Sequence, residues 1–168
     1  ERRPEWEIVL TGALDLVAGG PSTGERAAGD TKARPHKADR LRRQPNVTWA
    51  GRVPVDRVPC AIAALDVCLL PYECNDWTAN IDSLKLYEYL ACGRPVVSIG
   101  IPAARAFGDL VRIAEGPDTF VASIEAALRE DGPDAQDRRK AAAAANTWDM
   151  RVEQIESILA AALARRAP

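Results

Sequence analysis

Short apolar runs alternate with amphipathic stretches along the chain, and this pattern predicts strands and helices in alternation. Runs rich in β-branched residues predict strands at 7–10, 46–49, 67–70, 96–99 and 111–114, with the last at a sheet edge. Apolar side chains at helical spacing predict helices at 55–65, after Asn80, and at 119–129, 136–145 and 148–165. The helix after Asn80 is expected to end at Gly93 and to carry one apolar face, formed by Leu84, Tyr87, Leu90 and Ala91.

The order of these elements predicts an α/β fold with a Rossmann-like parallel sheet and helices on both faces. The runs 67–70 and 96–99 show no alternation, so both of their faces should be buried. A chain of 168 residues suffices for a single domain, expected over 1–168. The chain begins at Glu1 rather than Met and reaches its first strand almost at once, which suggests a domain incomplete at its N-terminus.

Two further segments carry expectations of their own. Residues 13–35 are rich in Gly and Pro with little periodicity, and they predict a flexible loop. The last helix should begin after Thr147 as its N-cap and use an apolar face to cover this domain or a missing one. That face is formed by Ile155, Ile158, Leu159 and Leu163.

The segment from Asn80 to Gly100 carries the candidate chemistry. Ligands of parallel sheets bind at the carboxyl ends of the strands, where this segment begins. The backbone N–H groups of Ser83, Leu84 and Lys85 at the start of the helix suit an anion such as phosphate. A carboxylate one turn further, Glu88, can accept hydrogen bonds from two sugar hydroxyls. We therefore expect a nucleotide-sugar site.

Each of these residues also has an ordinary structural interpretation. Glu88 at i,i+3 from Lys85 can form a surface ion pair, and Lys85 can instead pair with Asp82. Asn80 is a residue type common at helix entry.

Three more candidates follow strands at the same predicted edge. Gly51 and Arg52 follow the second strand, where the glycine lets a base approach and the arginine reaches base or phosphate. A turn requirement explains Gly51 equally well. Tyr72 follows the third strand and either stacks on a ligand or covers the core.

The charge composition limits the kinds of partner that the chain is expected to bind. A formal net charge of −2 gives no reason to expect nucleic acid. The strongly basic stretch is interpreted as a solvated helix face, with a peripheral membrane contact as the alternative. It comprises Lys32, Arg34, His36, Lys37, Arg40, Arg42 and Arg43.

The four cysteines lack C-x-x-C spacing, and there is a single histidine, so no metal site is expected. Cys60, Cys68, Cys74 and Cys92 are interpreted as structural. A reducing cytoplasm is the expected compartment.

Several segments in the right order resemble a known family. They are TWAGRV, LDVCLLPY, NIDSLKLYEYLACGRPVVS and NTWDMRVEQIESIL. Together they are similar to the C-terminal half of family 4 retaining glycosyltransferases, which have the GT-B fold of two facing Rossmann-like domains. The resemblance covers most of residues 5–163 apart from the loop at 13–35.

The resemblance implies a donor-binding domain. The family signature is Glu-x7-Glu, whose second glutamate matches Glu88 and contacts the donor ribose. The first glutamate, which contacts the transferred sugar, falls at Asn80. A variant subgroup has a proline where Ser83 stands and keeps the lysine at Lys85. An amide at Asn80 can still bind hydroxyls, but more weakly than a carboxylate.

The implied protein is a hexosyltransferase that moves a sugar from an NDP-sugar to a glycan, lipid-linked or small-molecule acceptor with retention. Its acceptor domain and two phosphate-binding cations would lie upstream of Glu1, so this chain alone should be inactive. No cofactor or metal is implied. The alternative is a non-catalytic nucleotide-binding or interaction module of the same fold. The nucleotide base, the sugar, the acceptor and the oligomeric state are left open.

Overall fold

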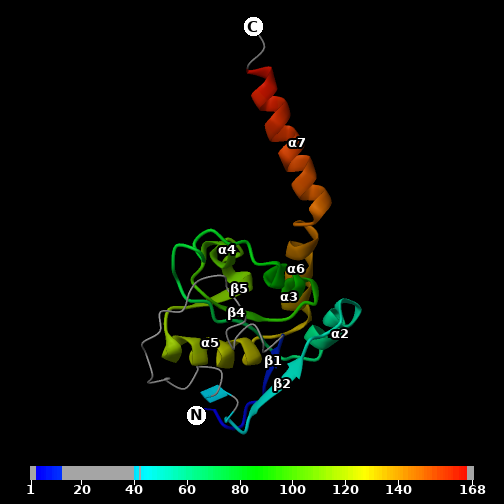
Figure 1. Cartoon of the computed structure of the whole chain (residues 1–168). Coiled ribbons are helices and arrows are strands. Elements are labelled where there is room, and N and C mark those ends of the chain that lie inside the picture. The colour runs from blue at the N-terminus through cyan, green and yellow to red at the C-terminus, as the bar shows by residue number, and fades with distance from the viewer. Residues whose placement is uncertain (1–2, 13–39, 42, 166–168) are drawn as a thin grey trace, which may run out of the picture. The chain divides into compact units, whose positions relative to one another are not determined.

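The computed structural model describes residues 3–12, 40–41 and 43–165, in two compact units (Figure 1). The first unit is Glu1–Val58 and the second is Pro59–Pro168. The predicted loop at 13–35 and most of the basic stretch lie outside the described residues.

The first unit is built on two parallel strands, β1 (Ile8–Thr11) and β2 (Val47–Gly51). A side-chain amide fixes the entry to β2, because Asn46 Nδ2 donates to the carbonyl oxygens of Arg3 and Trp6 at 3.2 and 2.8 Å. A short 3-10 helix, η2 (Val55–Arg57), follows. Both strands begin and end within two residues of their predicted positions.

The second unit contains a three-stranded parallel sheet in the order β3-β4-β5. Its strands are β3 (Cys68–Leu70), β4 (Val96–Ile99) and β5 (Val111–Ala114). The central strand β4 is buried over Val96, Val97 and Ser98. The α/β class and the edge position of β5 are therefore confirmed. The absence of alternation in β4 has the expected cause, burial on both faces.

Helices flank this sheet on both sides. α5 (Pro117–Arg129) packs against β4 and β5, and α3 (Leu84–Ala91) packs against β4. Figure 1 shows α5 on one side of the strands, with α3 and α6 (Pro133–Ala144) on the other. Two short helices, α2 (Val58–Ala63) and α4 (Pro102–Arg105), and the 3-10 helix η3 (Gly108–Leu110) complete the connections. The sequence analysis missed α4.

The core face of α3 differs from the predicted one. Leu86 and Leu90 are fully buried, whereas Leu84 is 60% exposed. Leu86 and Leu90 are four residues apart, so they lie on one face of the helix, and that face packs against the sheet. Leu84, the first helical residue, lies on another face. The predicted apolar face was wrong in placing Leu84 in the core, and Leu84 is free to meet a ligand.

A buried arginine fastens α6 to the end of α3. Arg139 is 7% exposed, and its Nε donates to the carbonyl oxygen of Gly93 at 2.9 Å. The same guanidinium pairs with Asp131. Gly93 itself has φ of +71°, as predicted for the residue that ends the helix, and an added Cβ would lie 2.9 Å from Lys140 Cε. This close packing joins two helices that are distant in sequence.

The last helix, α7 (Trp148–Ala164), has no buried residue within the described part of the chain. Thr147 caps it as predicted, because its side-chain oxygen accepts from Met150 N. The predicted apolar face is present but uncovered among the described residues, since Ile155, Ile158 and Leu159 are all more than half exposed. Of the two alternatives considered for this face, coverage of the described part of this domain was therefore wrong, and coverage of a missing domain stays a prediction.

Burial in the core predicts how the cysteines react. Cys68 is buried in β3, and burial raises the pKa of its thiol to about 12. Because the thiolate is the nucleophile, Cys68 should resist a thiol reagent in the folded chain from pH 7 to pH 10. The exposed thiols of Cys60 and Cys74 should react readily. Peptide mapping of timed labelling with iodoacetamide checks this, and rapid native labelling of Cys68 would contradict it.

The arginine at the α3–α6 junction predicts a large stability effect. Arg139→Met removes the side-chain donor of the Gly93 carbonyl and the cation beside the Asp131 carboxylate, which keeps only the amide of Gln136 as a side-chain donor among the described residues, in a largely buried environment. We expect the free energy of unfolding to fall by about 3–5 kcal/mol, measured by urea denaturation. The neighbouring Arg138→Met is the matched control, because its partner Asp109 is exposed and the pair is solvated. Equal effects of the two substitutions would contradict the assignment.

Candidate functional site

The predicted edge of the sheet exists in the second unit. The segment from Tyr72 to Glu88 leaves the carboxyl end of β3 and runs into the second turn of α3. It contains all the predicted site residues except Gly51 and Arg52. Those two belong to the first unit and are described with it.

The N-terminus of α3 has no side-chain cap. Ser83 occupies the N-cap position with extended backbone, but its hydroxyl bonds to the phenol oxygen of Tyr72 at 3.0 Å. The backbone N–H groups of Leu84 and Lys85 have no intrahelical acceptor by their position in the first turn. A diverted Ser83 therefore leaves the helix terminus with donors suited to an anion.

Tyr72 closes the loop between β3 and α3 through a side-chain hydrogen bond. It is half-buried, and its bond to Ser83 joins the beginning of the loop after β3 to its end. This loop closure was not predicted, because the sequence gives no sign of which hydroxyl Tyr72 reaches. Both alternatives considered for Tyr72, stacking or covering the core, omitted this role.

Glu88 and Lys85 are exposed and unpaired within the described part of the chain. Neither side chain forms a hydrogen bond or an ion pair with a described residue, so the Lys85–Glu88 surface pair is not formed. Asp82, the other candidate partner of Lys85, instead accepts from the hydroxyl of Tyr87 at 2.8 Å. Both charges remain available to a ligand at this end of α3.

Asn80 has a structural contact of its own. Its Nδ2 donates to the carbonyl oxygen of Asp76 at 2.9 Å, and its backbone N–H bonds to the carbonyl of Trp77. Because Ser83 is the N-cap of α3, Asn80 is not the helix-entry residue. Its amide nitrogen closes a turn, and its side-chain carbonyl oxygen has no hydrogen-bond donor among the described residues.

That turn is organised by Thr78, which the sequence analysis missed. Thr78 is 3% exposed, and its hydroxyl donates to the carbonyl of Glu73 at 2.6 Å. Asn75 and Thr78 also exchange bonds, from Asn75 N to Thr78 Oγ1 at 2.8 Å and from Thr78 N to Asn75 Oδ1 at 2.9 Å. The Asn and Thr spacing of three is a weak signal for such a turn.

In the first unit, Gly51 ends β2 with φ of +68°, and no atom would lie within 4 Å of an added Cβ. The turn requirement considered for Gly51 is therefore present, while space for a ligand is left as well. Arg52 follows it with an exposed side chain.

An unpredicted cation stands beyond β4. Arg105 of α4 donates from Nε to the carbonyl of Gly100 at 3.1 Å, and its guanidinium covers that residue so closely that a Cβ there would lie 2.3 Å from Nη2. Its exposed partner Glu115 is 3.8 Å away. The sequence analysis missed Arg105 because it missed the helix that carries it.

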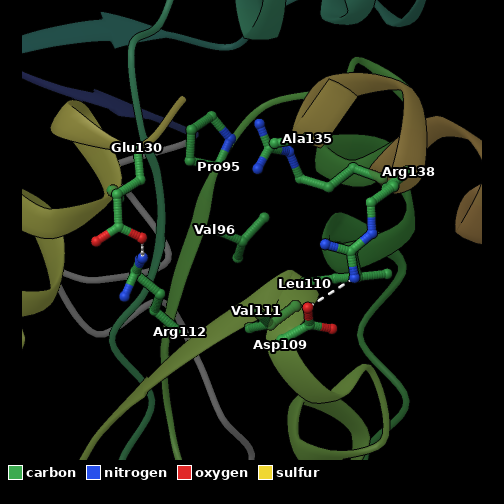
Figure 2. A pocket seen from close by; sticks show the side chains of 11 residues that line it. Pro95, Val96, Asp109, Leu110, Val111, Arg112, Glu130, Ala135 and Arg138 are labelled. Carbon is green, nitrogen blue, oxygen red and sulfur yellow. Dashed lines mark hydrogen bonds and ion pairs between the residues drawn. The ribbon is translucent and has the colours of Figure 1, made fainter. Parts of the chain in front are cut away.

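Two cavities of the second unit can be compared with this edge, and the first lies at the opposite ends of the strands. One, of about 430 Å³, is lined by Val96 and Val111 at the amino ends of their strands. Figure 2 shows Arg138 directed at Asp109 on one wall, while Arg112 meets Glu130 on the other. The Arg138 hydrogen bond holds the pKa of Asp109 below its usual range. These charges are already neutralised, so this cavity is a poorer candidate for an ionic ligand.

A second cavity of about 430 Å³ lies between α3, α4, α6 and the start of α7. Tyr87 meets Phe107 edge to face in its wall, with ring centroids 5.6 Å apart. The Tyr87 hydroxyl donates to Asp82 and accepts from Arg151 at 3.1 Å. Burial, followed by the bond to Asp82, raises the pKa of Tyr87. This network joins α7 to α3, which is a structural task.

Two properties of the described residues concern metal ions and membranes. Among the described residues, no three His, Cys, Asp or Glu side chains gather in a metal-binding arrangement. In the same part of the chain, every helix is too short or too polar to cross a bilayer.

Comparison with known proteins identifies the family of the chain. Residues 9–130 match the family described as "Glycosyl transferases group 1". The chain is also 30% identical over 159 residues to the "Putative teichuronic acid biosynthesis glycosyltransferase TuaH" of Bacillus subtilis (strain 168). That match covers 92% of this chain and 36% of the relative, so the chain spans little more than a third of the relative's length. By the extent of the family match, the chain belongs to the glycosyl transferases group 1 family.

Proposed function

We propose that this chain is the donor-binding half of a family 4 retaining glycosyltransferase, which transfers a sugar from an NDP-sugar to an acceptor. The observation that carries the proposal is the uncapped N-terminus of α3 with unpaired Glu88 further along the same helix. Anionic phosphate and neutral hydroxyls are the two chemistries these groups suit, and a nucleotide-sugar contains both.

The spacing along α3 supports this assignment. Glu88 lies four residues after Leu84, about 6 Å along the helix axis. A diphosphate bound by the N–H groups of Leu84 and Lys85 would therefore place its attached ribose near the Glu88 carboxylate. The Lys85 ammonium adds a positive charge beside the same phosphates.

The chemistry proposed for this half is stabilisation of the leaving group. As the bond between sugar and diphosphate breaks, negative charge grows on the phosphate oxygens. The helix N-terminus and Lys85 oppose that charge with fixed dipoles and a cation, which lowers the barrier. No carboxylate near α3 is needed as a nucleophile in this scheme, and no metal is needed for the charge.

The acceptor would bind to a part of the full-length protein outside this chain. Nearly two thirds of the TuaH relative lies outside the match, which leaves room for an acceptor domain. The relative's name places it in teichuronic acid biosynthesis. We propose for this chain only the reaction that it would share with the relative, which is sugar transfer. We place that reaction on the cytoplasmic side of the membrane, with peripheral membrane contact if the acceptor is lipid-linked.

A non-catalytic nucleotide-binding module is the second candidate. The bond of Asn80 to Asp76 favours it, because the position that the resemblance gives to a sugar-binding carboxylate here holds a turn-closing amide. Transfer assays on the full-length protein separate the two candidates. Nucleotide binding without any transfer would favour the module.

The ribose assignment predicts a selective loss on removing one charge. We expect UDP, GDP or dTDP to raise the melting temperature of the chain. Glu88→Gln should weaken that nucleotide about ten- to hundredfold, because it loses charge-assisted bonds to two hydroxyls. Glu153→Gln, on the exposed surface of α7, is the matched control and should bind like the wild type. A folded chain that responds to no nucleotide would sink the proposal.

The phosphate assignment predicts a different selectivity for Lys85→Met. Removing this ammonium should weaken the best nucleoside diphosphate about three- to tenfold, and the effect should shrink at high salt. Binding of the corresponding nucleoside, which lacks phosphate, should be unchanged. Calorimetric titrations of both ligands at two salt concentrations measure this. Equal losses for the nucleoside and the diphosphate would contradict a phosphate contact.

A further inference from the structure

A tryptophan is displayed to solvent in the loop between β3 and α3. Trp77 is 68% exposed, although an indole is among the largest apolar surfaces a protein can bury. It lies between Asp76, whose carboxylate is exposed, and Thr78, whose side chain is buried. The sequence analysis gave Trp77 no role.

The turn that carries Trp77 is fixed on both sides of the indole. Before it, Asn75 exchanges two hydrogen bonds with Thr78 at 2.8 and 2.9 Å. After it, Asn80 bonds through Nδ2 to the Asp76 carbonyl, and its backbone N–H bonds to the carbonyl of Trp77 itself. These bonds hold the backbone of the turn while leaving the ring uncovered. The exposure of Trp77 is therefore a property of an ordered turn.

The same loop leads to the proposed phosphate site. The bond between Tyr72 and Ser83 closes the loop at the N-terminus of α3, so the Trp77 turn and the free N–H groups belong to one tied segment. Leu84, at that N-terminus, is 60% exposed. Apolar surface and anion-binding donors thus occur together at the carboxyl end of β3.

An indole beside a carboxylate is complementary to a pyranose. A pyranose has an apolar face of C–H groups, which packs on an aromatic ring, and a rim of hydroxyls, which donate to carboxylates. Trp77 supplies the first surface. Asp76 and the amide oxygen of Asn80, which no described residue occupies, supply acceptors for the second. In a nucleotide-sugar the pyranose is joined directly to the diphosphate, so it would enter this loop from the phosphate site.

We propose that Trp77 stacks against the pyranose ring of the donor nucleotide-sugar and so contributes to sugar binding separately from the nucleotide. This inference rests on the proposed function. It assigns the sugar contact to an aromatic ring on the turn that Asn80 closes.

The test compares each nucleoside diphosphate with its sugar conjugate by calorimetry: UDP with UDP-glucose, GDP with GDP-mannose, and dTDP with dTDP-glucose. Trp77→Ala should weaken the nucleotide-sugar that the wild type binds best about five- to tenfold, and leave the matching diphosphate unchanged. Trp77→Phe should retain most of the affinity. Trp148→Ala removes a similarly exposed indole, 74% exposed on α7, and should change neither ligand.

Different results would contradict the stacking of Trp77 and the proposed donor-binding function. Unchanged sugar-conjugate binding in a folded Trp77→Ala variant overturns the stacking and leaves the proposed function standing. Equal losses for conjugate and diphosphate also overturn it, because Trp77 would then act on the nucleotide or on the loop. A wild-type chain that binds none of the six ligands overturns both proposals.

Discussion

Burial of β4 on both faces is the constraint on which the second unit depends. Val96, Val97 and Ser98 are almost inaccessible, and parallel pairing with β3 and β5 requires each connection to cross from one end of the sheet to the other. All three strands therefore release their loops at one edge. That edge gathers Tyr72, Gly100 and Glu115, which no local sequence pattern connects. The parallel direction of the strands therefore determines where the candidate site lies, and the side chains determine only what it can bind.

The orientation of α3 follows from that core. Leu86 and Leu90 are fixed against the sheet, so Lys85 and Glu88 must lie on the outward side of the helix. The helix is also held at both ends, by the Ser83 hydroxyl at its start and by Arg139 on the Gly93 carbonyl beyond its end. A rigid helix of this kind keeps its N–H groups and its carboxylate at a constant separation. Preorganisation of that sort is what binding a diphosphate and a ribose together requires.

Sequence reasoning predicted the fold because the fold depends on local, periodic signals. The strands 96–99 and 111–114 match their predicted ranges, Gly93 ends its helix with a positive φ, and Thr147 caps α7. The missing features depend on contacts between residues far apart or on short irregular turns. Arg139 reaches a carbonyl 46 residues away, and the buried Thr78 is part of a turn with no periodicity. The core face of α3 was misplaced because two sets of apolar positions fit helical spacing, Leu84, Tyr87 and Ala91 in one and Leu86 and Leu90 in the other, and only packing against β4 selects between them.

Charge pairing differs between the cavity at the amino ends of the strands and the edge at their carboxyl ends, and this difference indicates where an ionic ligand would bind. In the cavity at the amino ends of the strands, Arg138 and Arg112 are already matched by Asp109 and Glu130. An anion would have to break those pairs before it gained anything. At the carboxyl edge, Lys85 and Glu88 have no partner among the described residues, and the helix N-terminus lacks a cap. A ligand there gains new charge-assisted bonds without losing old ones, apart from displaced water. The cavity at the amino ends of the strands is concave, but its charges are already paired. The carboxyl edge keeps charges without a partner among the described residues, and these are the charges that a nucleotide-sugar would use if the chain acts as we propose.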